Sequence, residues 1–323
     1  MRGISALRAW WEERSPAAGS AVMATGILSV GLHQTGAETA SLLALAMTAV
    51  AWAALAAGFA LRLVSERRRW VNEAESPGSL TAVAATAVIA TRVAMLGLQA
   101  LAEALLALAA LLWPALLVLV VRHFRPRMPG AVFLCCVATE ALAVSAATLA
   151  AAERTAWLAH TALVVFWLGL LLYVLALVHF DARQVLRGAG DQWIAGGALA
   201  ISALAGTKLL MASDTGMYLW NDDDRGVLRT VTIALLVLDL AGYVVLLAAE
   251  AAPPRHGYHV LRWSTVFPMG MTAVATLSVA TGLGVLWLSL PGRVLLWVAV
   301  AAWFAVAAGA LLAACSGDGD GDG

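Results

Sequence analysis

Hydrophobic residues occur in ten long runs that are separated by short polar connections. Each run approaches the roughly 20 apolar residues that an α-helix needs to cross a hydrocarbon core about 30 Å thick. No connection is long enough for a separate soluble catalytic or nucleic-acid-binding domain. The pattern therefore predicts an all-α polytopic membrane protein whose transmembrane domain covers residues 18–314. The predicted helices are 18–34, 40–61, 80–98, 103–121, 131–150, 156–178, 192–211, 228–249, 260–285 and 293–314.

Composition supports this prediction and excludes an ordinary soluble domain. The chain is 62% hydrophobic and 12% charged, whereas soluble domains are roughly 45–50% apolar and about 25% charged. Residues 1–17 combine Trp10 and Trp11 with three arginines, which predicts a cytoplasmic segment that lies at the membrane interface. Residues 315–323 consist mainly of Gly and Asp, so we expect a disordered acidic tail.

The distribution of basic residues predicts the orientation of the helices. The termini and alternate connections on one side hold 14 arginines, whereas the other side holds at most five basic residues and the run Asp222-Asp223-Asp224. Because cytoplasmic loops are enriched in Lys and Arg, both termini are expected in the cytoplasm. Lys208 is the single lysine beside 19 arginines, which is typical of a GC-rich prokaryotic genome, so we expect a prokaryotic plasma membrane.

Hydroxyl side chains are concentrated in alternate helices. The five odd-numbered predicted helices contain 17 Ser and Thr residues, and the five even-numbered ones contain five. Polar side chains are unfavourable against lipid, so helices that concentrate them are expected to face a protein interior or a water-filled path. We therefore expect five helical hairpins, in which the odd helices form an inner barrel around a pore and the even helices form an outer ring.

Polar residues of the odd helices are the candidates for an anion path through this barrel. Arg92 and Lys208 would make the pore positive, although an Arg92–Glu140 ion pair within the bundle fits the sequence equally well. Any single hydroxyl can also be explained by hydrogen bonding within packed helices. Asp239 is in an outer helix and is interpreted as a helix contact. The candidate path residues are Thr25, Ser29, Thr86, Arg92, Thr139, Glu140, Ser202, Lys208, Ser264, Thr265 and Ser278.

The ninth predicted helix has features of a gate. Pro268 removes one helical hydrogen bond, so a kink is expected there, with Gly270 close by. Phe267 would project beside this bend, where an aromatic ring could close a narrow channel. The alternative from the residues alone is that Phe267 is an ordinary packing residue.

Cysteine and histidine residues give no sign of a metal or haem site. Cys135 and Cys136 lie in one apolar run and Cys315 is near the C-terminus, a spacing that fits neither a disulfide framework nor a zinc site. Four of the six histidines lie at helix ends or in a loop without further ligands, and no catalytic motif occurs on a suitable element. We therefore expect neither a cofactor nor an enzymatic activity, and a membrane enzyme or a haem protein is the less favoured alternative.

Three segments resemble the tellurite-resistance/dicarboxylate transporter family, which includes fungal malate permeases, sulfite efflux pumps and plant guard-cell slow anion channels. They are residues 22–29 (VMATGILS), 193–206 and 263–271 (WSTVFPMGM), and weaker similarity occurs at 83–92 and 137–144. The resemblance implies a ten-helix barrel of five hairpins, an anion path lined by the odd helices and usually a homotrimer with one pore per subunit. It also implies that Phe267 is the aromatic gate.

The sequence departs from the family pattern at four positions, which leaves the identity of the anion open. Ala85, Ala87 and Ala90 occupy positions where Gly, Asn and Gly are expected, and Glu140 occupies one where Gln is expected. The predicted function is transmembrane transport of a small anion, such as a C4-dicarboxylate, sulfite, nitrate or chloride. A channel gated by Phe267 is one mechanism. A proton-coupled dicarboxylate or sulfite carrier that uses Glu140 is the other.

Overall fold

The structure is a computed structural model that describes residues 18–214, 220, 222–251 and 260–316. Within these ranges it is helical and contains no strand, apart from one isolated bridge between Met128 and Phe180. The all-α class is therefore confirmed. The predicted interfacial segment at 1–17 lies outside the described residues, as does the predicted tail beyond Ser316, the residue at which the last helix ends.

Nine helical spans among the described residues are long and apolar enough to cross a membrane. The remaining long helix, α2, corresponds to the first predicted run but has only 16 residues. The long helices are α2 (Gly19–Gln34), α3 (Glu38–Ser65), α5 (Thr81–Met95), α6 (Gln99–Arg122), α7 (Leu134–Glu153), α8 (Ala156–His179), α10 (Ile194–Ser213), α11 (Asp222–Ala251), α12 (Trp263–Gly282) and α13 (Ser289–Ser316).

The observed helix bounds differ from the predicted ones at both ends, and the largest difference is at the start of α11. The helix α11 begins at Asp222, six residues before the predicted start at 228. Its first turn therefore holds Asp222, Asp223 and Asp224, and carboxylates at this position are stabilised by the positive end of the helix dipole. A hydropathy pattern cannot detect this polar first turn, because the pattern follows only the apolar part of a helix.

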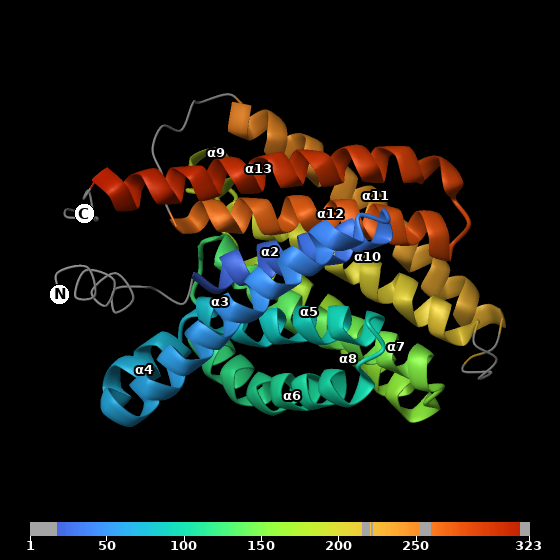
Figure 1. The fold of residues 1–323 in the computed structure, drawn as a ribbon, viewed down its shortest axis with the longest axis horizontal. Coiled ribbons are helices and arrows are strands. Elements are labelled where there is room, and N and C mark those ends of the chain that lie inside the picture. The colour runs from blue at the N-terminus through green and yellow to red at the C-terminus, as the bar shows by residue number, and fades with distance from the viewer. Residues whose placement is uncertain (1–17, 215–219, 221, 252–259, 317–323) are drawn as a thin grey trace.

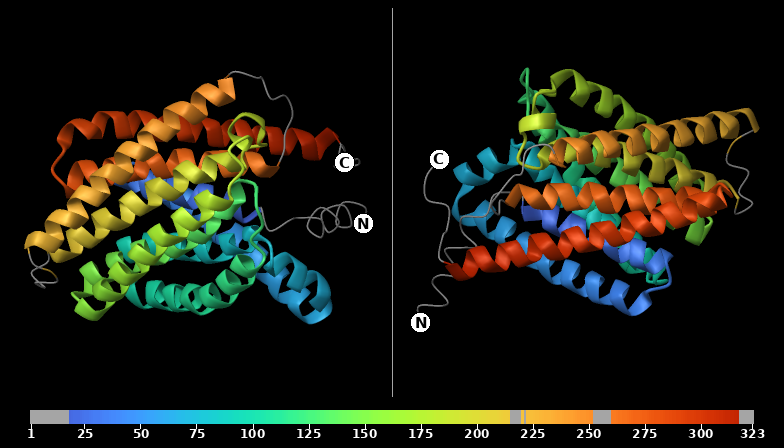
Figure 2. Two further views of the ribbon diagram at one scale, coloured as in Figure 1. Left: turned by 180° about the vertical axis from the view of Figure 1, so that it is seen from behind. Right: turned by 90° about the horizontal axis from the view of Figure 1, so that it is seen from above.

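Burial alternates along the chain and divides the long helices into two groups. The most apolar part of the span that contains α7 is 94% buried, whereas that of α3 is 6% buried. We call α2, α5, α7, α10 and α12 the inner helices, and α3, α6, α8, α11 and α13 the outer helices. The contacts link α2, α5, α7, α10, α12 and again α2 in a cyclic order, and each outer helix packs on the inner helix that precedes it (Figures 1 and 2).

Four of the inner helices begin with a single 3₁₀ turn. These turns are η2 (Pro77–Leu80), η3 (Gly130–Phe133), η4 (Asp191–Trp193) and η5 (Val260–Arg262), and they lead directly into α5, α7, α10 and α12. The remaining short elements are α4 (Arg67–Ala74), α9 (Gln184–Arg187) and η6 (Leu286–Leu288). Since consecutive inner and outer helices run in opposite directions, the five inner helices run parallel and start at the same end of the molecule (Figure 1).

Three tryptophans of outer helices donate hydrogen bonds to threonines of inner helices. Each threonine hydroxyl donates to a main-chain carbonyl one turn earlier in its own helix, so its oxygen remains able to accept the indole N–H. Each bond connects an outer helix to the inner helix of the next hairpin, and the bond from α13 to α2 joins the last hairpin to the first. The bonds are Trp52 Nε1 to Thr86 Oγ1 at 2.8 Å, Trp113 Nε1 to Thr139 Oγ1 at 2.8 Å, and Trp303 Nε1 to Thr25 Oγ1 at 2.9 Å.

Asp239 makes a similar connection between α11 and α12. Its side chain is fully buried, and Thr272 Oγ1 donates a 3.1 Å hydrogen bond to Asp239 Oδ1. The structure thus agrees with the interpretation of Asp239 as a helix contact.

Glycines allow the inner helices to approach their neighbours closely. A Cβ atom on Gly26 of α2 would lie 2.9 Å from a methyl group of Val88 on α5. A Cβ atom on Gly197 of α10 would lie 2.9 Å from the ring of Pro268 on α12. Because real Cβ contacts are longer, a larger residue at either position would push two inner helices apart. Small residues at such contacts are typical of helix packing in membranes.

We predict that Trp113→Phe lowers stability because it removes the indole donor to Thr139 while it keeps most of the ring. Interhelical hydrogen bonds of this kind contribute about 0.6–1.7 kcal/mol in membranes, so the unfolding midpoint in detergent should fall. A double-mutant cycle with Thr139→Val measures the coupling directly. Additive effects of the two substitutions would show that the hydrogen bond contributes nothing.

Candidate functional site

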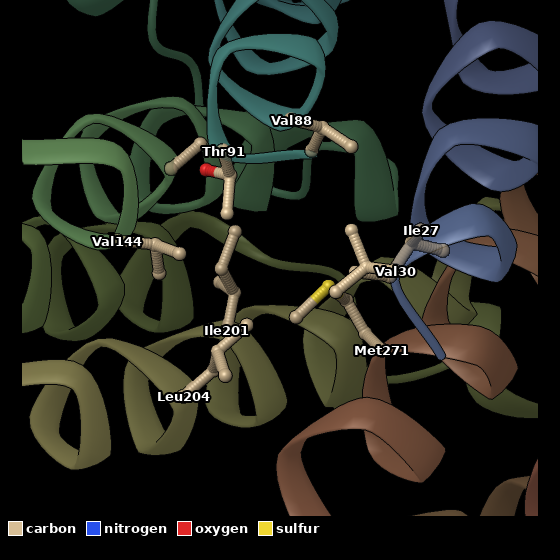
Figure 3. Close-up of a pocket in the computed structure, with 9 residues that line it drawn as sticks. Ile27, Val30, Val88, Thr91, Val144, Ile201, Leu204 and Met271 are labelled. Carbon is tan, nitrogen blue, oxygen red and sulfur yellow. The ribbon is translucent and has the colours of Figure 1, made fainter. Parts of the chain in front are cut away.

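The five inner helices enclose a small space at the centre of the ring. The centre of a water molecule could occupy a volume of about 10 Å³ in this space. The space therefore has room for about one water. Figure 3 shows side chains from different inner helices that converge on this space. The residues that line it are Ile27 and Val30 of α2, Val88 and Thr91 of α5, Ala141 and Val144 of α7, Ile201 and Leu204 of α10, and Met271 of α12.

The central space is lined almost entirely by aliphatic side chains. Four helices each contribute two residues that are three positions apart, which places both on one helix face. Thr91 is the single hydroxyl among the lining residues, and its Oγ1 donates to the carbonyl of Ala87 at 2.9 Å. This lining offers an anion no donor that could replace its water of hydration. We therefore describe the space as a closed aliphatic constriction.

None of the residues predicted from the sequence to line an anion path is among the nine that line this constriction. Polar side chains on the inner helices were the basis of that prediction, whereas the observed lining is aliphatic. The sequence signal for it is a pair of apolar residues three positions apart, which occurs in three of the inner helices. A role for the predicted residues above or below the constriction stays a prediction.

Four predicted path residues use their hydroxyl groups to hold outer helices. Thr25, Thr86 and Thr139 accept the tryptophan N–H bonds described above. Ser29 donates to the main-chain oxygen of Ser41 on α3 at 2.8 Å, and Ser41 donates to the main-chain oxygen of Ser29 at 2.7 Å. The observed contacts of these four hydroxyls therefore fit the alternative interpretation, in which they form hydrogen bonds within packed helices.

The predicted gate residue lies on α12, one helical turn before the constriction. Phe267 is 1% exposed and is separated by four positions from Met271, so the two side chains share one face of the helix. The helix continues without interruption through Pro268. Gly270 faces α2, where an added Cβ atom would lie 2.9 Å from Ile27. Phe267 is therefore close to the constriction along α12, and its role as a gate stays a prediction.

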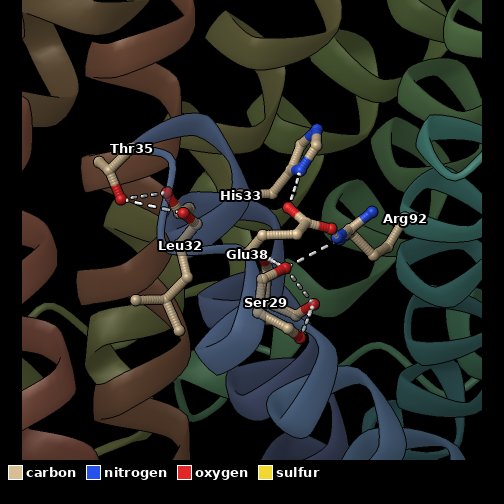
Figure 4. Close-up of polar contacts among 8 residues, drawn as sticks. Ser29, Leu32, His33, Thr35, Glu38 and Arg92 are labelled. Atoms are coloured by element: carbon tan, nitrogen blue, oxygen red, sulfur yellow. Dashed lines mark hydrogen bonds and ion pairs between the residues drawn. The ribbon is translucent and has the colours of Figure 1, made fainter.

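Arg92 lies in a cluster of charged and polar groups at the end of α5. It is fully buried, its Nη2 pairs with Glu38 Oε1 at 2.6 Å, and its Nε donates to Ser41 Oγ at 3.0 Å. The other carboxylate oxygen of Glu38 contacts His33 Nδ1 at 2.5 Å (Figure 4). The Arg92–Glu140 ion pair that the sequence allowed does not form. Glu38 begins α3 after a connection of only three residues from the end of α2, and this proximity brings its carboxylate to Arg92.

Glu140 and Lys208 lie on inner helices without an ion-pair partner among the described residues. The Glu140 side chain is fully buried, and both of its oxygens lack a hydrogen-bond partner there. It lies against Gly169 of α8, where an added Cβ atom would clash with the carboxyl group. Lys208 is partly exposed near the end of α10.

The remaining predicted path residues form hydrogen bonds to a neighbouring segment or within their own helix. Ser264 donates to Ser20 Oγ on α2 at 3.1 Å, and Thr265 donates to the carbonyl of Gly190 at 3.4 Å. Ser278 accepts from Gln34 Nε2 at 2.8 Å, and Ser202 donates to the carbonyl of Ala198 at 2.8 Å. In the part of the chain that the structure describes, no group of three His, Cys, Asp or Glu side chains could hold a metal ion.

A ring of buried parallel helices around a narrow centre, sheathed by lipid-facing helices, defines a polytopic membrane protein of the channel or transporter class. The family model described as voltage-dependent anion channel, SLAC1, matches residues 14–311. The chain therefore belongs to this family, and the resemblance seen in the sequence is confirmed. A comparison with curated proteins finds no match. At the level of the family, the function is anion transport across a membrane.

We predict that Glu38→Ala destabilises the protein because it leaves the buried guanidinium of Arg92 without its counter-ion. Glu38 is 45% exposed, so water partly replaces the lost contact and the expected loss is about 1–2 kcal/mol. Glu38→Gln keeps an acceptor oxygen, so its loss of stability should be smaller. Thermal unfolding in detergent provides the comparison. Equal midpoints for Glu38→Ala and wild type would contradict a stabilising Arg92–Glu38 pair.

Proposed function

We propose that the protein conducts small anions through a path along the axis of the inner helices, and that the aliphatic constriction is the closed part of this path. The single observation that carries the proposal is that all five inner helices contribute side chains to one narrow space. Membership of the anion channel family supports anions as the transported species. The proposed substrates are C4-dicarboxylates, sulfite, nitrate and chloride.

The proposed architecture is ten transmembrane helices in five hairpins, with the inner helices as a barrel around the pore. The cyclic order of inner-helix contacts supports it. A helix of 16 residues such as α2 is about 24 Å long, which suffices for a span that is surrounded by protein rather than lipid. Both termini in the cytoplasm and a homotrimer with one pore per subunit complete this proposal. Such a protein would function in a prokaryotic plasma membrane.

Electrostatic features at both ends of the inner helices favour anions. All five inner helices start at the same end, and among their first turns and the 3₁₀ turns before them only η4 holds an acidic residue, Asp191. Their positive dipole ends therefore surround one mouth of the proposed path. At the other end, Lys208 is partly exposed and carries no paired acid among the described residues. Both arrangements would raise the local concentration of anions.

We predict that Ile201→Ala increases anion flux, because it removes an aliphatic side chain from the constriction. Phe267→Ala should also increase flux if the aromatic ring closes the same path one turn away. Ile233→Ala is the matched control, since Ile233 is 38% exposed on the outer helix α11. The measurement is chloride and nitrate flux into proteoliposomes under an applied voltage. A several-fold increase in the first two variants and no change in the control is expected.

The same experiment decides against the proposal if Ile201→Ala leaves the flux at the wild-type level while the control variant and the wild type both transport. An unchanged flux in Phe267→Ala alone would assign Phe267 to packing and leave the aliphatic constriction as the gate.

A second mechanism is proton-coupled transport of a dicarboxylate or sulfite with Glu140 as the proton carrier. The observation that favours it is the burial of both Glu140 oxygens without a hydrogen-bond partner among the described residues. An unpaired carboxylate in this environment is strongly disfavoured relative to the neutral acid. A side chain held in this way can bind and release a proton when its surroundings change.

We predict for this mechanism that Glu140→Gln abolishes malate or sulfite uptake driven by a pH gradient and preserves voltage-driven flux. Glutamine has nearly the same shape and cannot exchange a proton. The test compares uptake with and without an imposed gradient in the same proteoliposomes. Full retention of gradient-driven uptake in Glu140→Gln would remove Glu140 from the transport mechanism and leave the channel proposal in place.

A further inference from the structure

A second cavity, far larger than the central space, lies on the flank of the molecule between α3, α4, α5 and α6. Its volume is about 720 Å³, which is within the range of about 300–1,000 Å³ typical of small-molecule sites. In Figure 1, the Ser65 end of α3 and the short helix α4 stand away from the inner helices. Small side chains on the facing helices leave the space unfilled, namely Ala54, Ala56, Gly58 and Ala60 of α3 and Ala82 and Ala85 of α5.

The length of the cavity corresponds to one leaflet of a membrane. The helix α3 contributes lining residues from Trp52 to Ser65, a distance of about 20 Å at 1.5 Å per residue. One leaflet of the hydrocarbon core is about 15 Å thick. Trp52 is 14 positions from Glu38 at the start of α3, so it lies close to the middle of the bilayer. The cavity thus extends from the bilayer centre to one membrane surface.

The chemistry of the lining changes along this length. Toward the bilayer centre it is formed by Trp52, Leu55, Leu108 and Leu112, and Phe59 lies between these residues and the surface end. Near the membrane surface it is formed by Arg62, Ser65, Glu66, Trp70, Glu73 and Ser79. This change from an apolar to a polar lining matches an amphiphile that has an apolar chain and a polar end.

One polar donor at the surface end of the cavity lacks a partner. The Nε1 atom of Trp70 is buried and has no hydrogen-bond acceptor among the described residues. The Trp70 ring packs against Phe59 with a centroid distance of 5.3 Å, which fixes its position. By contrast, Arg62 Nη1 donates to both oxygens of Glu73, at 2.9 and 3.1 Å. The unsatisfied indole N–H requires an acceptor from outside this part of the chain.

We propose that this cavity binds a membrane phospholipid, with an acyl chain in its apolar part and an ester or phosphate oxygen that accepts the Trp70 N–H. Tryptophan and tyrosine are enriched at the headgroup level of membrane proteins. Arg62 and Glu73 at the surface end are paired with each other, so the polar contact proposed for the occupant is the one with the Trp70 donor. This binding site is independent of the proposed transport activity.

A phospholipid fits these observations better than a second copy of the chain. A neighbouring helix is about 10–12 Å wide with its side chains, and an apolar outer helix would bring no acceptor to Trp70. An acyl chain is narrow, flexible and already present at this depth. An experiment can distinguish a second copy of the chain from a phospholipid at this site.

Photolabelling with a phospholipid tests the site directly. The purified full-length protein is reconstituted in phosphatidylcholine vesicles that contain a trace of phosphatidylcholine with a diazirine in the middle of one acyl chain. After illumination, labelled peptides are mapped. We expect label on the α3, α5 and α6 segments that line the cavity, and at least fivefold less label there in Gly58→Phe, whose side chain would fill the space.

Gly242→Phe is the matched control for this experiment. Gly58 lines the cavity, whereas Gly242 is on the outer helix α11, and an added Cβ atom meets nothing within 4 Å at either position. The control should be labelled in the cavity like wild type. Trp70→Phe keeps the packed ring and removes only the donor, so it should reduce the label at least twofold even if Gly58→Phe does not fold.

Two results would overturn the proposal. Label in the cavity segments of folded Gly58→Phe, or of Trp70→Phe, that equals the wild-type level would show that no lipid occupies the site as described. Spontaneous disulfides between copies of a Leu55→Cys variant would place a second copy of the chain on this face instead. Ion flux is not part of the readout, so failure of the transport proposal would leave the outcome unaffected.

Discussion

The structure depends on the requirement that polar side chains placed between helices in the hydrocarbon core be paired, because an unpaired polar group there is costly. Indole N–H groups of α3, α6 and α13 meet this requirement through threonine hydroxyls of α5, α7 and α2. Because each threonine already donates to its own helix, only its acceptor site is available, and a tryptophan supplies a donor alone. The two residue types are therefore complementary, and each pair fixes the rotation of an inner helix relative to an outer one.

This complementarity determines what is left at the centre of the ring. A helix that turns its hydroxyl groups toward the outer ring must turn other positions inward, and in three inner helices these positions are aliphatic pairs such as Ile201 and Leu204. The centre of the ring is consequently apolar. In the proposed mechanism this constriction closes the path by excluding water, whereas the starts of the inner helices and Lys208 attract the anion. In this account, attraction of the anion and closure of the path are performed by different groups.

The sequence was sufficient for the helical class and for the separation of buried from lipid-exposed helices. Both follow from the length of apolar runs and from the unequal distribution of Ser and Thr, which are properties of whole segments. It was insufficient for the contacts of individual side chains. Thr86 and Ser29 were predicted to line a pore, yet the observed partners of their hydroxyls are Trp52 and Ser41.

The partner of Arg92 could not be read from the chain either. The sequence offered Glu140, which lies inside a predicted span, whereas the structure pairs Arg92 with Glu38 at the start of α3. The rotation of a helix about its axis decides such pairings, and hydropathy carries little information about rotation when a helix is buried on all sides. The inner helices are of this kind, since all residues of α5 except Ala82 and Met95 are buried.

The central claim is that anions pass through the middle of the inner ring, and modification of a cysteine at the constriction tests it most directly. In a variant with Ile201→Cys and the native cysteines replaced, a small anionic thiol reagent should block anion flux through proteoliposomes, and transported anions should slow the reaction. Ile233→Cys on the lipid-facing side should be unaffected. Complete reaction at position 201 without any loss of flux would contradict a path through the centre of the ring.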